Sequence, residues 1–316
     1  MEDRVRIGVS ACLLGEKVRY DGGHKRDPFI TKTLSAWFEF VPVCPEAECG
    51  LGVPREAMHL TGNPESPRLV TRTTGRDLTD RMLSWARARL DGLAEQDLCG
   101  FIFKSRSPSS GMERVPVYTE AGMSVRRGRG LFAAAFMDRF PRLPVEDEGR
   151  LSGMGIRENF IERVFTLRRW RDLLDRDPSV RGLMGFHAAH KLLIMSHSPR
   201  HMREMGRLAA AGKGMPAGEL FSRYEAFLME AMALKATPKK HSDVLMHMMG
   251  YFKKDLSGDE KRELLEVIED FRKGLLPLVA PLTLLSHYVR KYGSEYLAGQ
   301  AYLSPHPAEL GLRNHA

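Results

Sequence analysis

The stretch RDLTDRMLSWARARLDGLAEQDLCGFIFK, residues 76–104, joins a helical pattern to a short apolar run. Apolar side chains recur at helix-like spacing in its first part, at Leu78, Met82, Trp85, Leu90 and Leu93. This spacing lines up one apolar face and predicts a helix over residues 76–97. The run GFIFK at 100–104 is short and apolar and begins with a glycine, as expected of a buried strand. The stretch therefore predicts a helix that leads into a buried strand.

Three other short runs have the same strand-like character: RIGVS (6–10), FEFVPV (38–43) and RLVT (68–71). Strands that alternate with helical segments favour an α/β domain with a mainly parallel sheet. The turn-rich, acidic segment FPRLPVEDEGRLS (140–152) marks the end of this pattern. We therefore expect an α/β domain over residues 1–148 and an all-α domain over residues 149–316. The helices expected in the second domain cover residues 156–175, 179–196, 199–211, 217–235, 240–254, 259–274 and 280–292.

Composition indicates a globular protein of the cytoplasm, with 43% hydrophobic and 28% charged residues. The sequence shows no secretory signal and no apolar stretch long enough for a membrane span. Residues 1–150 carry 23 Lys and Arg against 21 Asp and Glu, whereas residues 151–316 carry 25 against 19. The positive excess thus lies mainly in the second half, where it suits either a polyanionic partner or an ordinary basic surface. No GxGxxG or P-loop motif is present, so no nucleotide cofactor is expected.

Three of the four cysteines follow predicted strands. Cys12 comes after the first strand, and Cys44 and Cys49 come after the second. The serine-rich loop 105–110 follows GFIFK. Loops after the carboxyl ends of parallel strands meet at one edge of the sheet, so these residues are expected to converge. The residues alone allow a cluster or metal site, a catalytic thiol or ordinary buried cysteines, since disulfides are rare in a reducing compartment. Cys99, at the entry to a strand, is interpreted as a small buried hydrophobe.

Three motifs resemble those of the thiouracil-desulfurase family and occur in the family's order: SACLLGEKVRYDGGHKRD (10–27), VPVCPE (41–46) and FKSRSPSSG (103–111). The second half resembles the YbgA-type helical domain through ENFIERVF (158–165), FHAAHKLLIMSHSP (186–199), HSDVLMHMMGYFKK (241–254) and PLTLLSHY (281–288). Proteins that join both domains resemble tRNA 4-thiouridine desulfidases. The resemblance implies an enzyme that removes sulfur from thiolated uracil, with 4-thiouridine in tRNA as the expected substrate. Free 2-thiouracil as the substrate and a non-catalytic RNA-binding protein are the alternatives.

The resemblance also implies a 4Fe–4S cluster that is held by three cysteines and has one iron without a protein ligand. Cys12 and Cys44 match the first two cysteine positions, but Ser110 stands at the third. An alkoxide is a harder donor than a thiolate. Our hypothesis is therefore that Cys49 supplies the third thiolate from the neighbouring loop. Ligation by Ser110, a labile cluster on two cysteines and an inactive site are the alternatives.

The same resemblance implies that Glu46 is an acid/base residue and that a serine of the third motif, assigned here to Ser107, is catalytic. Asp21 and Lys25, beside the glycines of YDGGHK, are candidates for substrate binding. In the helical half, RNA binding is expected from cationic side chains that could contact phosphates. These are Lys235, Lys239, Lys240, His241, Lys253, Lys254, Arg290 and Lys291.

Overall fold

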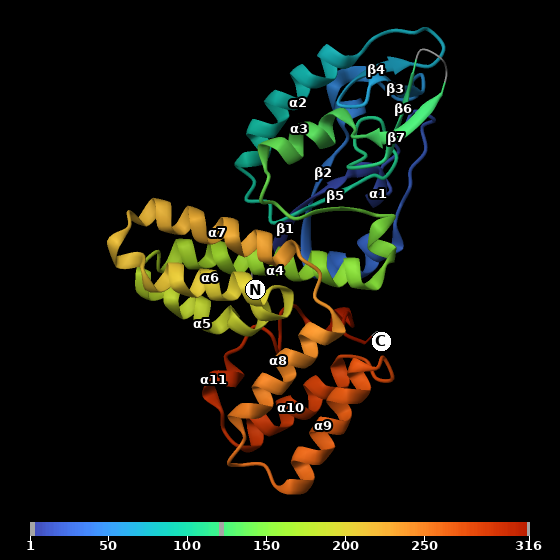
Figure 1. Ribbon diagram of the computed structural model, residues 1–316. Coiled ribbons are helices and arrows are strands. Elements are labelled where there is room, and N and C mark those ends of the chain that lie inside the picture. Colours follow the sequence, from blue (N-terminus) through green and yellow to red (C-terminus); the bar gives the residue numbers. More distant parts are fainter. Residues whose placement is uncertain (1–3, 120–122, 315–316) are drawn as a thin grey trace. The chain divides into compact units, whose positions relative to one another are not determined.

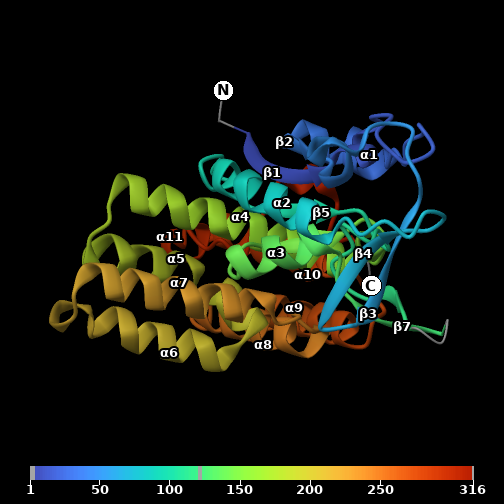
Figure 2. The ribbon, with the colours of Figure 1, turned by 90° about the horizontal axis from the view of Figure 1, so that it is seen from above.

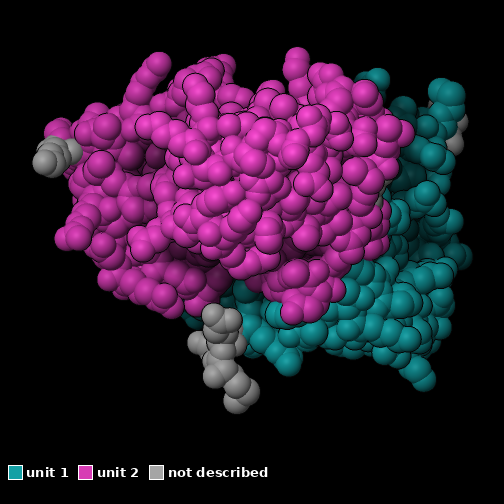
Figure 3. All heavy atoms as spheres, turned by 90° about the horizontal axis from the view of Figure 1, so that it is seen from below, with its two compact units in different colours: residues 1–153 teal, residues 154–316 magenta. Residues whose placement is uncertain are grey.

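The computed structural model describes residues 4–119 and 123–314 of the chain. It divides into two compact units, Met1–Gly153 and Met154–Ala316, which are coloured separately in Figure 3. The predicted boundary lay after residue 148. The division falls slightly later because the turn Arg150–Ser152 still belongs to the first unit, where Arg150 bonds Glu146 and Glu113.

The first unit contains eight strands and three helices among its described residues (Figure 1). Its strands are β1 (Val5–Ser10), β2 (Phe38–Val43), β3 (Met58–Asn63), β4 (Ser66–Thr71), β5 (Phe101–Phe103), β6 (Val115–Tyr118), β7 (Ser124–Gly128) and β8 (Val145–Asp147). Its helices are α1 (Ala11–Leu14), α2 (Thr79–Ala94) and α3 (Leu131–Arg139), with shorter helical turns at Phe29–Thr33, Leu34–Ala36, Ala47–Leu51 and Arg150–Ser152.

Four of these strands form a parallel sheet in the order β2-β1-β5-β8. This confirms the predicted α/β class, and the predicted strands at 6–10, 38–43 and 100–104 all lie in the sheet. Gly8 of β1 lies under the ring of Phe101, and a Cβ at this position would come within 2.2 Å of that ring. Phe101 also packs on Phe132 and Phe136 of α3, with ring centroids 6.0 and 4.6 Å away. A run of aromatic rings therefore fixes α3 on the sheet.

A second sheet, in the order β4-β3-β6-β7, was only partly predicted. The predicted strand at 68–71 lies in it, within β4, where it pairs antiparallel with β3. The pairing of β3 with β6 is parallel, and β7 returns antiparallel to β6. The side chains that pack under this sheet form what we call the second-sheet core: Cys49, Met58, Leu60, Leu69, Leu78, Met82, Val115, Val117 and Leu131.

The second unit is helical, as predicted, and no strand occurs in its described part, residues 154–314. Its helices are α4 (Met154–Arg176), α5 (Val180–His197), α6 (Pro199–Ala210), α7 (Ala217–Ala233), α8 (Pro238–Tyr251), α9 (Gly258–Arg272), α10 (Val279–Lys291) and α11 (Glu295–Ala298). Further short turns are Gly212–Gly214 and Ala308–Leu310. Helices α4 to α7 run alongside one another in both ribbon views (Figure 2).

Side-chain caps explain why several of these helices begin where they do. The hydroxyls of Ser179, Ser198 and Thr237 accept hydrogen bonds from backbone N–H groups in the first turns of α5, α6 and α8. Ser257 and Glu260 form a reciprocal capping box at the start of α9. None of the described helices has the length and apolar character needed to cross a bilayer.

A buried ionic network lies inside the helical unit. Glu162 of α4 accepts hydrogen bonds from Arg313 Nη2 at 2.9 Å and from His197 Nε2 at 3.1 Å. Burial alone would raise the pKa of Glu162, but the His197 hydrogen bond and the Arg313 charge hold it below its usual value. Nearby, burial and the charge of Glu162 raise the pKa of Glu158 to about 8. The C-terminal segment is thus tied to α4 through Arg313.

We predict that Glu162→Gln lowers the free energy of unfolding by about 3–5 kcal/mol, because it removes the charge that compensates the buried Arg313. The matched control is Glu219→Gln, which breaks an exposed pair with Arg223 on α7 and should cost at most about 0.5 kcal/mol. Urea unfolding followed by circular dichroism measures both. If the two variants had equal free energies of unfolding, the buried network would not stabilise the fold as proposed.

Candidate functional site

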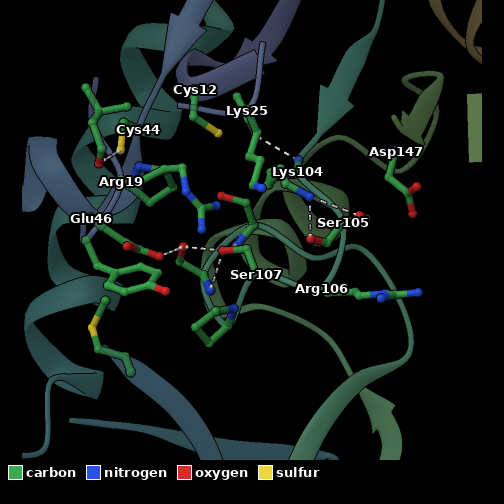
Figure 4. A pocket seen from close by; sticks show the side chains of 18 of the residues that line it. Cys12, Arg19, Lys25, Cys44, Glu46, Lys104, Ser105, Arg106, Ser107 and Asp147 are labelled. Atoms are coloured by element: carbon green, nitrogen blue, oxygen red, sulfur yellow. Dashed lines mark hydrogen bonds between the residues drawn. The ribbon is translucent and has the colours of Figure 1, made fainter. Parts of the chain in front are cut away.

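A cavity of about 850 Å³ is lined by the segments that follow the strands of the parallel sheet. They are residues 10–12 at the end of β1, 43–46 at the end of β2 and 104–110 after β5, together with Asp147, Gly149 and Arg150 at the end of β8. Because β1 lies between β2 and β5, the chain crosses to one side of β1 and later to the other. Such a reversal leaves a crevice outside the carboxyl ends of the strands, where ligands bind in α/β folds. Figure 4 looks into this cavity.

Two of the predicted sulfur ligands line the cavity. Cys12 lies on α1 directly after β1, and Cys44 follows the last residue of β2, as the register Ser10 to Val43 requires. Burial and the neighbouring Cys44 raise the pKa of Cys12 to about 11. Burial also raises the pKa of Cys44. Cys44 thus lies close enough to Cys12 to disfavour the ionisation of the Cys12 thiol, a cost that a bound cation would relieve.

Cys49 lies elsewhere in the same loop. Its side chain belongs to the second-sheet core and is not among the residues that line the cavity. Its thiol donates a hydrogen bond to the Glu46 carbonyl at 3.4 Å, and burial raises its pKa. Cys99 is fully buried, in line with its interpretation as a small core residue. Ligation by Cys49 stays a prediction, while Ser110 lines the cavity.

Glu46 is joined to the serine loop by hydrogen bonds. Its Oε2 pairs with the guanidinium of Arg55, whose Nε lies 3.0 Å away, and its Oε1 accepts a hydrogen bond from Ser109 Oγ at 2.8 Å. Ser109 Oγ lies 3.0 Å from Ser107 Oγ, so a line of hydroxyls leads from the carboxylate to Ser107 (Figure 4). The sequence indicated Glu46 and Ser107 but not Ser109, which connects them, or Arg55, which orients the carboxylate.

The serine loop is fastened to the beginning of α3. The N–H of Leu131 donates to Pro108 O at 3.2 Å, and the N–H of Phe132 donates to Ser109 O at 2.9 Å. Gly130 lies so close that an added Cβ would come within 2.5–2.7 Å of the backbone of Ser109 and Ser110. The position of Ser109 therefore depends on a glycine twenty-one residues later in the chain, which no local pattern signalled.

The two predicted substrate-binding residues fall in different places. Lys25 lines the cavity, and its side chain extends into it in Figure 4. Asp21 is not a lining residue. Its carboxylate accepts a hydrogen bond from the Gly23 N–H at 3.0 Å and pairs with Arg19, 3.6 Å away. Asp21 therefore holds a loop and a lining arginine rather than facing the cavity itself.

Cationic side chains line the cavity in a number that the sequence did not reveal. Some belong to ion pairs, among them Lys104, which pairs with Glu148, and Arg150, which pairs with Glu113 and Glu146. Four others are exposed and form no salt bridge with any residue that the structure describes. They are Lys25, Arg72, Arg106 and Arg126. Because they come from distant parts of the chain, only the fold brings them together.

The cationic residues predicted for RNA contact in the helical unit are only partly available. Lys240 Nζ donates to the carbonyls of His197 and Lys235, and Lys291 pairs with Glu260 at 2.7 Å. His241 is buried against Tyr302. The exposed members Lys253 and Lys254 form no salt bridge within the described residues. RNA binding by this unit stays a prediction.

Comparisons with known proteins divide the chain in the same way. Residues 7–148 match the family model of 2-thiouracil desulfurase, and residues 191–307 match the model of a protein family of unknown function, DUF1722. The uncharacterized protein YbgA of Escherichia coli is 29% identical over 153 residues, which is 48% of this chain and 90% of YbgA. The uncharacterized protein YbbK of Bacillus subtilis is 29% identical over 147 residues, which is 45% of this chain and 96% of YbbK.

One solved structure also matches, the [4Fe-4S]-dependent thiouracil desulfidase TudS. It is 30% identical in sequence, and the match covers 47% of this chain and 94% of TudS with a TM-score of 0.38. The chain thus joins a 2-thiouracil desulfurase domain to a DUF1722 domain.

We predict that Gly130→Ala lowers the free energy of unfolding by about 1–3 kcal/mol, because the new methyl group overlaps the backbone of the serine loop. The control is Gly92→Ala in α2, where a Cβ meets only Arg89 Nη1 at 4.0 Å and a gain of up to about 1 kcal/mol is expected. Thermal unfolding of both variants tests the packing. A Gly130→Ala chain as stable as wild type would show that the loop moves freely.

Proposed function

We propose that this chain is an iron–sulfur desulfidase that acts on 4-thiouridine in tRNA. Its residues 7–148 match the family model of 2-thiouracil desulfurase. The observation that carries the proposal is the composition of the cavity. Two thiols, a carboxylate joined to a line of serine hydroxyls, and exposed cations meet in one space. Each group has a distinct task in removing sulfur from a base within a polyanion.

The donor atoms fit an iron–sulfur cluster in part. Cys12 and Cys44 provide two soft sulfur donors that line the same cavity, and iron–sulfur clusters are held by such ligands. The cavity also offers the hydroxyl of Ser110. When bound, a cluster with one iron free of protein ligands supplies a soft Lewis acid for the exocyclic sulfur of the base.

The chain's own residues supply the proton chemistry. Replacing C=S by C=O consumes one water and releases hydrogen sulfide, without any net gain or loss of electrons. Glu46 accepts a proton from the attacking water at its carboxylate, which Arg55 orients through Oε2. The hydroxyls of Ser109 and Ser107 extend this hydrogen-bonded line toward the base and hold the proton near the leaving sulfur.

The exposed cations favour a polynucleotide over a free base. Free thiouracil carries no phosphate, so it offers no partner for Lys25, Arg72, Arg106 and Arg126. A nucleotide within tRNA has phosphates on both sides of the ribose, and contacts from Lys and Arg position such a backbone. The target base must leave its stack to reach the thiols, as in other enzymes that modify bases.

We predict that Glu46→Gln slows desulfidation by about 10²–10⁴-fold because it removes the general base. The assay follows loss of the near-ultraviolet absorbance of thiolated tRNA after anaerobic reconstitution of the full chain. Glu39→Gln, which alters an exposed pair with Arg6 on β2, is the control and should retain the wild-type rate. Conversion of free 2-thiouracil with no change in thiolated tRNA would reject the tRNA substrate. No conversion of either by a chain with a full cluster would reject the enzyme.

We also predict that Arg106→Gly weakens the binding of tRNA without lowering the free energy of unfolding. Arg106 has a φ of 58°, in the left-handed region that favours glycine. The substitution should therefore keep or raise the free energy of unfolding, while it reduces the salt dependence of tRNA binding by about 0.7–0.9 in log–log slope.

The matched control is Asp97→Gly. Asp97 has a φ of 51° but does not line the cavity, so its replacement should leave tRNA binding unchanged. Unfolding by urea and filter binding across a salt series measure the two effects. An unchanged salt slope for Arg106→Gly would remove this arginine from the phosphate contacts.

A further inference from the structure

The family resemblance implies three cysteine ligands for the cluster, but this chain has Ser110 at the third of these positions. Two residues compete for it, Cys49 and Ser110. The thiol is the better iron ligand, since a serine oxygen is a harder and more basic donor. The placement of the two side chains, however, points the other way.

Cys49 is fixed on the far side of its loop. Its thiol packs in the second-sheet core and is hydrogen-bonded to the Glu46 carbonyl. The following backbone is clamped by Arg81, whose Nε donates to Cys49 O at 2.8 Å and whose Nη2 donates to Gly50 O at 2.7 Å. Turning the thiol into the cavity would break its hydrogen bond to Glu46 O and leave a void among buried apolar side chains. The hydrogen bonds from Arg81 oppose a shift of the backbone that would carry the thiol there.

Ser110 is already in place. It is 4% exposed and lines the same cavity as Cys12 and Cys44. Its backbone N–H donates to Ser107 Oγ at 3.1 Å, which fixes the residue. Its own hydroxyl has no hydrogen-bond partner among the residues that the structure describes. The hydroxyl oxygen is accessible from the cavity, so a ligand there can bind it directly.

We propose that Ser110 Oγ, and not Cys49 Sγ, is the third protein donor to the cluster, beside Cys12 and Cys44. This inference rests on the proposed function only in that it takes a cluster to be present. Each of the three donors loses one proton when its bond to iron forms, so the serine binds as an alkoxide. An alkoxide that competes with protons in water holds iron less firmly than a thiolate would. The resulting cluster is more easily stripped by a chelator than one on three cysteines.

The experiment compares iron and acid-labile sulfide per chain, and the rate of iron loss to a chelator, after anaerobic reconstitution. We expect Ser110→Ala to lose iron about tenfold faster than wild type or to load incompletely. Ser110→Cys should load fully and lose iron about tenfold more slowly than wild type. Cys49→Val, which keeps an apolar side chain in the second-sheet core, should match wild type in iron content and in the rate of loss.

Ser109→Ala is the matched control, because it removes the neighbouring hydroxyl that is bonded to Glu46 instead. It should keep the wild-type iron content. Circular dichroism of each apo variant verifies folding, so that loss of iron is not confused with loss of structure. Wild-type loading and iron retention by Ser110→Ala, or loss of the cluster in a folded Cys49→Val chain, would overturn the inference.

These readings need no substrate, so they separate this inference from the proposed function. A chain that holds its cluster through Ser110 but does not act on thiolated tRNA would refute the function and leave the ligand assignment standing. A chain that acts on thiolated tRNA but keeps its iron unchanged in Ser110→Ala would support the function and refute the ligand assignment.

Discussion

The site depends on one constraint, the parallel pairing of β1 with β2 and with β5. Parallel strands put all their carboxyl ends at one edge of the sheet, so the residues that follow them become neighbours. The register that pairs Ser10 with Val43 brings the segments carrying Cys12 and Cys44 out of the sheet at the same level. An antiparallel β2 would have placed the two thiols at opposite ends of the strands. The chemistry of the cavity thus follows from strand direction before any side chain is considered.

Glycine and aromatic packing maintain that arrangement. Gly8 leaves room for the Phe101 ring directly over β1, and the same ring holds α3 through Phe132 and Phe136. The N-terminus of α3 in turn fixes the serine loop through hydrogen bonds to Pro108 and Ser109. A continuous chain of contacts therefore runs from the core of the sheet to the hydroxyl groups at the cavity.

The sequence predicted those features that local periodicity encodes. The helices of the second unit lie close to their expected bounds because apolar spacing, Ser or Thr caps and Gly or Pro breaks act over a few residues. The second sheet was largely missed, since β7 consists of SVRRG and β3 ends in Thr-Gly-Asn, without a continuous apolar run. Its order also depends on the pairing of β3 with β6, which are more than fifty residues apart. No local pattern carries that information.

The placement of Cys49 shows the same limit within one loop. Its spacing from Cys44 suggested a shared site, because both thiols belong to a short segment. In the structure Cys44 lines the cavity, whereas Cys49 belongs to the helical turn Ala47–Leu51 and packs in the second-sheet core. The spacing of the two cysteines in the sequence does not reveal this difference in their surroundings.

The cations of the cavity also divide by their surroundings. Three of them form ion pairs with carboxylates and thereby orient them. These pairs are Arg55 with Glu46, Lys104 with Glu148, and Arg150 with Glu146. Lys104 and Arg19 also lower the pKa of Cys12 in opposition to burial and Cys44. The exposed cations make no salt bridge within the described residues, and in the proposed function they exchange counterions for phosphates. Paired cations thus build the site, and the exposed cations are those that the proposed polynucleotide would contact. The net charge of the chain does not reveal this division.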